Sequence, residues 1–164
     1  MSQNHRMLDE LDYKILIELA RNGRASFRKI AEKTGASVST VVSRIEGLKK
    51  NGVIKGYTVV IDPSKLGYDL SAIIHVRIRH GKLIEVQKTI ASSPNVFGVY
   101  DVTGESDSII LARFKNREEL SRFIKTLLSN EYVERTITYI VLDVIKEEWK
   151  PIQLLEALTE EIGR

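Results

Sequence analysis

Residues 26–52 read SFRKIAEKTGASVSTVVSRIEGLKKNG and predict two helices joined by a short turn. Ser26 can accept a hydrogen bond from the first turn of one helix, and Gly35 supplies the left-handed backbone conformation that ends it. Ser37 can begin the second helix in the same way, and Asn51-Gly52 ends it. Because apolar residues recur every three or four positions in the second helix, one of its faces is predicted to be buried. These residues are Val38, Val41, Val42, Ile45 and Leu48.

The opposite face of the second helix carries small, hydroxylic or cationic side chains and no acid. A short helix, a turn containing glycine and a second helix form the arrangement of a DNA-binding helix-turn-helix. The charge agrees, because residues 1–56 contain 11 basic and 6 acidic residues, a net charge of +5, whereas the whole chain carries +3. Basic charge is therefore concentrated where a polyanion would bind. The helix pattern alone leaves an ordinary solvated surface helix as the alternative.

We predict that this region binds double-stranded DNA through basic and hydroxylic side chains. Arg44 is expected to be the best ligand for a base or a phosphate. Because the face offers no Asn or Gln for bidentate contact with adenine, sequence preference should come partly from DNA shape and bending. The predicted DNA-binding residues are Arg28, Lys29, Ser37, Ser39, Thr40, Ser43 and Arg44.

The composition of the chain excludes several classes of protein. Its 164 residues are 43% hydrophobic and 29% charged, as in soluble globular proteins, and no stretch approaches the length of a membrane span. The absence of cysteine excludes disulfides and thiolate sites and fits a cytoplasmic location. The three histidines, His5, His75 and His80, lack the spacing of a metal site, and no phosphate-binding loop or nucleophile elbow is present. We therefore predict no catalytic residue, no metal and no cofactor.

The chain as a whole predicts an α+β protein with two main domains. Residues 8–22 have the apolar spacing of a helix, which completes a winged or three-helix helix-turn-helix domain. Residues 53–61 are rich in β-branched side chains and predict a strand that acts as a β-hinge. The predicted parts are the DNA-binding domain at 1–56, the hinge strand and linker at 57–70, a ferredoxin-like domain at 71–148, and a C-terminal helix or tail at 149–164.

The order of elements in residues 71–148 is strand, helix, strand, strand, helix, strand. This is the ferredoxin-like βαββαβ arrangement, in which both helices cover one face of an antiparallel sheet. The last strand, predicted over residues 133–145, carries apolar residues on both faces. Because two helices cover only one face of a sheet, the second face predicts contact with another copy of the chain, and hence a homodimer.

Several motifs follow one another along nearly the whole chain. They are Leu8-Asp9-x-x-Asp12-x-x-Ile15-Leu16, Gly23-Arg24, Ile30-Ala31, Ser37 to Arg44, Gly52-Val53-Ile54-x-Gly56-Tyr57, Asp62-Pro63-x-x-Leu66-Gly67 and Val102-Thr103-Gly104-x-x-Asp107. Together they resemble the Lrp/AsnC family of transcription regulators, also called feast/famine regulatory proteins. The resemblance implies a helix-turn-helix joined by a β-hinge to a ferredoxin-like effector domain, dimers that assemble into octamers or similar rings, and regulation by amino acids. One departure is Lys29, which stands where many members have an acid that completes a capping box with Ser26.

The loop from Thr103 to Asp107 has the composition of an ordinary hairpin turn, but the resemblance implies that it belongs to an effector site. A free amino acid needs an acceptor such as Asp107 for its ammonium, and N–H donors such as those around Gly104 for its carboxylate. In the family the pocket lies between dimers with a facing strand, whose candidates here are Thr136 and Thr138. The predicted effector-binding residues are Tyr100, Asp101, Thr103, Gly104, Glu105, Asp107, Thr136 and Thr138.

Two other functions remain as alternatives. Tetrapyrrole decarboxylases resemble the family in layout, and a coloured purified protein would favour such an enzyme. A stand-alone amino-acid sensor that signals through protein partners is the second alternative, against which the basic N-terminal region argues. We predict a DNA-binding regulator and not an enzyme, because the chain carries no catalytic motif.

Overall fold

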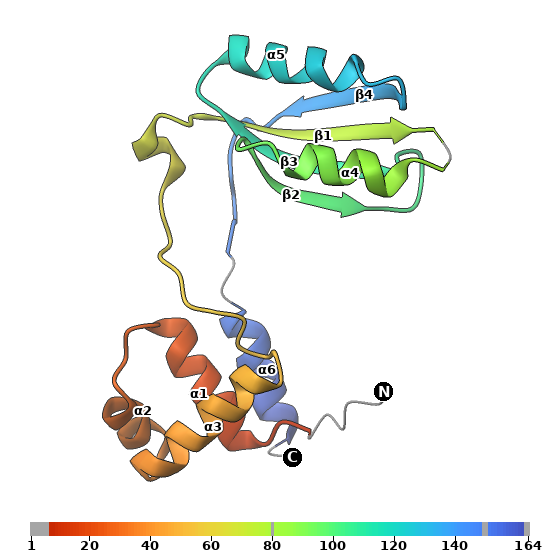
Figure 1. Cartoon of the computed structure of the whole chain (residues 1–164). Coiled ribbons are helices and arrows are strands. Elements are labelled where there is room, and N and C mark those ends of the chain that lie inside the picture. Colours follow the sequence, from red (N-terminus) through yellow and green to blue (C-terminus); the bar gives the residue numbers. More distant parts are fainter. Residues whose placement is uncertain (1–6, 80, 149–150, 163–164) are drawn as a thin grey trace. The chain divides into compact units, whose positions relative to one another are not determined.

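The computed structural model describes residues 7–79, 81–148 and 151–162, which form two compact units (Figure 1). One unit contains the chain up to Val60 together with the residues from Lys146 onward, and the other is Ile61–Ile145. Within the described ranges, no helix has the length and apolar character needed to cross a membrane. His5, His80 and Trp149 lie outside the described residues.

The first unit begins with the three predicted helices, α1 (Glu10–Arg21), α2 (Phe27–Thr34) and α3 (Val38–Lys50). The predicted caps are confirmed, because Ser26 accepts a hydrogen bond from the backbone of α2 and Ser37 accepts one from the backbone of α3. Gly35 ends α2 with a φ of 69°, a conformation that costs glycine little. The buried apolar residues of the three helices form one core, which contains Ile15, Ile30, Ala31, Val41, Ile45 and Leu48.

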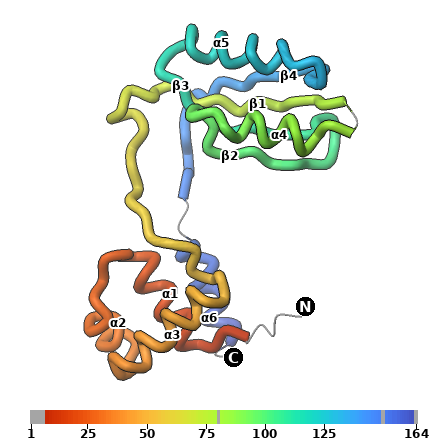
Figure 2. The backbone as a smooth tube through the Cα atoms, in the orientation of Figure 1, coloured from red at the N-terminus to blue at the C-terminus, as the bar shows by residue number. Residues whose placement is uncertain are grey.

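The C-terminal helix α6 (Ile152–Ile162) packs against α1 and belongs to the same unit. Figure 2 shows α6, at the blue end of the chain, beside α1, at the red end. The guanidinium of Arg21 on α1 pairs with the carboxylate of Glu156 on α6 at 2.6 Å. Ile17 is only 8% exposed yet lies outside the three-helix core, and it lines a hollow together with Glu156 and Thr159 of α6. The segment predicted as a helix or tail thus contains a fourth helix of the first unit.

The second unit has the predicted ferredoxin-like arrangement. Its elements are β1 (Leu70–Ile78), α4 (Leu83–Ala91), β2 (Val96–Asp101), β3 (Ser108–Phe114), α5 (Arg117–Leu128) and β4 (Val133–Ile140). The strands pair antiparallel in the order β2-β3-β1-β4, and α4 and α5 lie on one face of the sheet (Figure 1). Between sheet and helices lies a core that includes Ile74, Val76, Ile110 and Phe114, all with no exposed surface. Among the described residues of this unit, no helix covers the other face, and we call it the open face.

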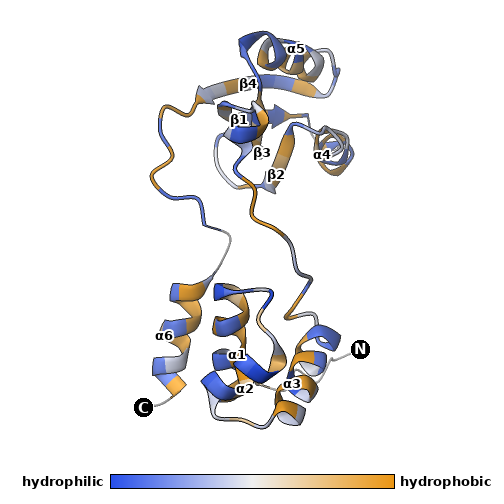
Figure 3. Cartoon of the chain, turned by 90° about the vertical axis from the view of Figure 1, so that its left-hand side faces the viewer, coloured by the Kyte–Doolittle hydropathy of each residue, from blue (hydrophilic) through white to orange (hydrophobic). Residues whose placement is uncertain are grey.

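Two predicted strand regions differ from the structure. Residues 53–61 pair with no strand in the described parts of the chain, and β4 ends at Ile140 instead of residue 145. Both regions are strongly apolar, and their side chains are exposed: Val59 and Val60 by 73%, Leu142 by 98%. Figure 3 shows these hydrophobic stretches in orange along the two connections between the units. A strand exists only where its backbone groups find a neighbour, so β propensity alone over-predicted both regions.

Candidate DNA-binding and effector-binding sites

The helix-turn-helix presents most of the predicted DNA-binding side chains to solvent. Arg28 and Lys29 on α2 are exposed, as are Ser39 and Ser43 on α3. Ser37 Oγ caps α3 by accepting from the backbone N–H of Thr40 at 3.1 Å, and it also lies 2.7 Å from the hydroxyl of Thr40. The capping hydrogen bonds therefore hold the hydroxyl groups of Ser37 and Thr40 at the start of α3. The start of a helix is a position where phosphate groups are readily bound.

Arg44, which we predicted to be the best ligand for a base or a phosphate, is paired with two acids in this structure. Its Nη1 lies 2.5 Å from a carboxylate oxygen of Asp9 and 3.1 Å from one of Asp12, and its side chain is 24% exposed. The hydrogen bond to Asp9 is the main cause that raises the pKa of Arg44, against the opposing effect of burial. Helix periodicity does not reveal this pairing, because the acids lie 32 and 35 residues earlier in the chain.

The predicted effector loop lines a hollow on the open face of the sheet. This hollow has a volume of about 680 Å³. Three of the predicted effector-binding residues line it: Asp101, Thr103 and Glu105. A smaller hollow of about 220 Å³ shares His75, Glu105, Ser106 and Ile137 with it and adds Arg77 and Arg135. Tyr100 stands opposite Ile109, a lining residue, in the pairing of β2 with β3, and Gly104 lies in the loop with a φ of 121°.

Thr136 and Thr138 lie on the other face of the sheet from this hollow. Thr138 pairs with Ile74 and Thr136 with Val76, and directly paired residues of antiparallel strands point to the same face. Ile74 and Val76 are fully buried under the helices, so the two threonines point toward the helices. The neighbouring residues Ile137 and Tyr139 line the hollow instead. Neighbouring residues of a strand point to opposite faces, so the two predicted threonines and the lining residues Ile137 and Tyr139 lie on different faces of the sheet.

Asp107, a predicted effector ligand, forms hydrogen bonds with the backbone of β1 in this structure. Its Oδ2 accepts a hydrogen bond from the backbone N–H of Ile78 at 2.7 Å, and its own N–H donates to the carbonyl of Val76. These bonds satisfy backbone groups at the end of β1, where the pairing of β1 with β4 shifts register between Arg77 and Ile78. Asp101 and Glu105 are the acids that line the hollow.

The sequence prediction missed several residues that form the floor and one end of the hollow. His75 lies 3.2 Å from the hydroxyl of Ser106 through its Nδ1, and its ring meets that of Tyr139 edge-on with centroids 5.1 Å apart. Arg77 donates to the carbonyl of Glu105 at 3.3 Å and stands directly opposite Arg135 across the two strands. The alternation of residues 72–79 was the available signal, because it places His75 and Arg77 opposite the core face.

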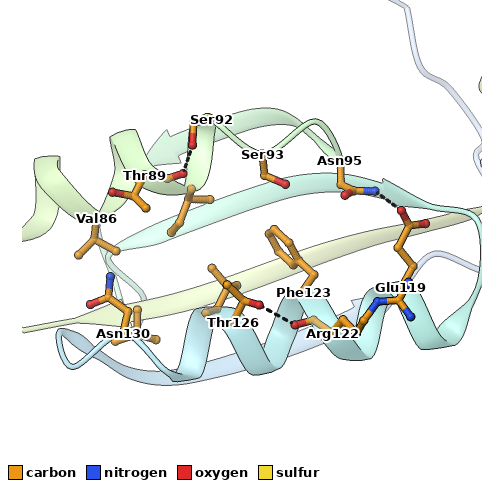
Figure 4. A pocket seen from close by; sticks show the side chains of 13 residues that line it. Val86, Thr89, Ser92, Ser93, Asn95, Glu119, Arg122, Phe123, Thr126 and Asn130 are labelled. Carbon is orange, nitrogen blue, oxygen red and sulfur yellow. Dashed lines mark hydrogen bonds between the residues drawn. The ribbon is translucent and has the colours of Figure 1, made fainter.

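A separate hollow of about 500 Å³ lies between α4 and α5, on the helical side of the sheet. Figure 4 shows its apolar side chains, among them Val86 and Phe123, and at one end the hydrogen bond from Asn95 to Glu119. The backbone N–H of Lys115 donates to Glu119 at 2.6 Å and is the main cause that lowers the pKa of this carboxyl. None of the predicted effector residues lines this hollow. In the described parts of the chain, no group of three or more His, Asp or Glu residues is placed to hold a metal ion.

Two family models match the chain, one for each of its two units. An AsnC-type helix-turn-helix domain matches residues 8–49, and an Lrp/AsnC ligand binding domain matches residues 71–150. Helix α6 lies beyond both matches.

Comparison with individual proteins gives the same result over nearly the full length. An HTH-type transcriptional regulator of Pyrococcus abyssi is 44% identical over 144 residues, which are 88% of this chain and 98% of the relative. The regulator FL11 of Pyrococcus horikoshii is 43% identical over 85% of this chain and 93% of its own. Among solved structures, a transcriptional regulator of Neisseria meningitidis in complex with L-Met has a TM-score of 0.82 and 30% identity, covering 88% of this chain and 96% of that one. AsnC of E. coli has the same TM-score with 26% identity, covering 87% and 97%.

Proposed function

The chain belongs to the Lrp/AsnC family of transcription regulators, and from that premise we propose that it binds a free amino acid on its open face and thereby changes its assembly and its binding to operator DNA. The relatives are transcriptional regulators, and the chain is not an enzyme. A DNA-binding helix-turn-helix also argues against a sensor that acts through protein partners alone. The observation that carries the proposal is a hollow lined by acids and apolar side chains, which adjoins a smaller hollow lined by two arginines.

Each part of an amino acid has a chemical counterpart in this hollow. The carboxylate of Glu105 can accept a hydrogen bond from an ammonium group. Asp101 also lines the hollow, although it pairs with Ser108 of the helical face. Arg77 and Arg135 stand opposite each other, and although Glu134 lies 3.8 Å from Arg77, two neighbouring arginines favour a further anion beside them. A ligand carboxylate would supply that anion and accept charge-assisted hydrogen bonds.

The floor of the hollow favours an apolar ligand side chain. Ile109, Ile137 and the ring of Tyr139 line it. The Neisseria neighbour in complex with L-Met supports an effector of this kind, and methionine is the first amino acid to test. The same apolar residues are half-exposed or exposed in the single chain, which supports a homodimer in which a second copy covers the open face. Assembly of such dimers into an octamer or a similar ring is the arrangement that we propose for the complete regulator.

The proposal is tested by screening the common amino acids for thermal stabilisation of the purified protein. A ligand that binds only the folded state raises the unfolding temperature as its concentration rises. We expect methionine or another apolar amino acid to do so. Arg77→Gln and Arg135→Gln should each weaken its binding about tenfold, the effect of roughly 1.4 kcal/mol.

Lys125→Gln is the matched control, because Lys125 is an exposed cation on α5, on the other side of the sheet. It should leave amino-acid binding unchanged. If no amino acid stabilises the protein, or if all three variants bind it like the parent, the hollow is not the effector site.

A further inference from the structure

We infer that Arg44 orients the recognition helix α3 and does not contact DNA, and that it acts through Asp9 and Asp12 at the start of α1. We call these three residues the Asp–Arg cluster. Its members come from two helices, since Asp9 is the N-cap of α1, Asp12 lies in its first turn and Arg44 lies in the middle of α3. The contacts between them therefore fix one helix relative to the other.

Every carboxylate oxygen of the cluster has a defined partner. Asp9 Oδ1 accepts from the backbone N–H of Asp12 at 3.0 Å, and Asp12 Oδ2 accepts from the backbone N–H of Asp9 at 3.1 Å. These two bonds form the capping box of α1. The remaining oxygens, Asp9 Oδ2 and Asp12 Oδ1, both accept from Nη1 of Arg44 at 2.5 and 3.1 Å. Each acid thus holds the start of α1 with one oxygen and α3 with the other.

The burial of the cluster makes these bonds important for orientation. The Asp12 side chain is only 6% exposed, and a carboxylate removed from water needs charged and hydrogen-bonding partners. The apolar contacts of Val41 and Ile45 hold α3 in the core, but apolar contacts are not directional. A rotation of α3 about its axis would break both bonds of Arg44. The cluster therefore sets the direction in which the exposed face of α3, with Ser39 and Ser43, meets the DNA.

The replacement Asp12→Asn distinguishes a positioning role of Arg44 from a DNA-contacting role, because the two roles predict opposite changes in DNA affinity. If Arg44 were a DNA ligand held back by the acids, this replacement would release it and tighten DNA binding. Loss of a negative charge beside a polyanion also tightens binding by itself. A positioning role gives the opposite result, and we expect DNA binding to weaken about tenfold. The asparagine oxygen can still accept from Asp9, so the cap of α1 is kept.

Glu32→Gln is the matched control, because Glu32 is an exposed acid on α2 of the same unit. It removes the same charge and should bind DNA as tightly as the parent or slightly more tightly. Measurements are made below the unfolding transition, with the helical content of each variant checked by circular dichroism. Tighter or unchanged DNA binding by Asp12→Asn would overturn the inference.

The salt dependence of Arg44→Gln gives a second, independent readout. Loss of a phosphate contact lowers the slope of log affinity against log salt by about one. A positioning residue should instead leave the slope unchanged while the affinity falls, and a lower slope would overturn the inference. The double variant Asp12→Asn/Arg44→Gln should lose less affinity than the sum of the two single losses, because the two residues act as a pair.

A conservative replacement keeps the test decisive if Asp12→Asn fails to fold. Arg44→Lys retains the positive charge, but its side chain is one atom shorter, so the ammonium group does not reach the position of Nη1 beside both carboxylates. A phosphate ligand would keep nearly the parent's affinity after this change. A positioning residue would not, and we expect the affinity of Arg44→Lys to fall clearly below that of the parent.

Discussion

Asp107 uses its side chain to complete the backbone hydrogen bonds at the end of β1, where Oδ2 accepts from the N–H of Ile78. Asp107→Ala should therefore destabilise the second unit by about 1–3 kcal/mol, the cost of leaving a backbone donor without a partner. Asp107→Asn keeps an oxygen at that position and should cost clearly less. Urea unfolding of the three proteins measures the difference. If all three proteins are equally stable and both variants lose the amino-acid response, Asp107 acts as an acceptor for the ligand and not as a structural residue.

At the scale of elements, α6 contributes an apolar face that completes the unit containing α1. Leu158 is half-buried, whereas Leu154 is 60% exposed on the same helix. Leu158→Asp should detach α6, expose Ile17 and lower the free energy of unfolding of the helical unit by about 1–3 kcal/mol. Leu154→Asp is the control and should change it by less than about 0.5 kcal/mol. Chemical unfolding followed by circular dichroism would measure both, and equal losses would show that α6 does not stabilise the unit through this face.

The elements that the sequence predicted correctly are those defined by nearby residues. The caps Ser26, Gly35 and Ser37 and the apolar spacing of α1 to α3 act within a few residues, so they appear directly in the sequence. Strand ends depend on partners far along the chain, which explains why residues 53–61 and 141–145 were over-predicted. The amphipathic pattern of α6 predicted a helix but could not identify α1 as its neighbour.

The predicted sites also divide into features set by nearby residues and features set by residues far along the chain. Exposure of Arg28, Ser39 and Ser43 follows from helix periodicity, whereas the contact of Arg44 with Asp9 joins two helices that are distant in sequence. In the effector domain the predicted loop lines the hollow, whereas the predicted threonines of β4 point toward the helices. The face of β4 is set by its pairing with β1, and the irregularity in that pairing lies between Arg77 and Ile78. Strand composition alone carries no information about such a shift.

For the whole molecule, a dimer that covers the open face would link effector binding to assembly. If a second copy covers the hollow, part of the ligand's surroundings belongs to that copy, and the ligand's affinity then depends on protein concentration. By linkage the ligand must strengthen the assembly by the same factor. DNA affinity would follow, because helix-turn-helix domains joined in one particle bind neighbouring DNA segments with a higher effective concentration.

Leu111→Asp tests this linkage without altering a residue that lines the hollow. Leu111 pairs with Ile73 on the open face, where a carboxylate would oppose burial against a second copy. We expect the variant to be smaller than the parent by light scattering, and to bind both the amino acid and operator DNA at least about tenfold more weakly. Ile84→Asp is the control, because Ile84 is 58% exposed on α4 and should affect neither property. A variant of parental mass would exclude the open face as the interface, whereas a monomer with parental affinity for the amino acid would show that one copy forms the complete site.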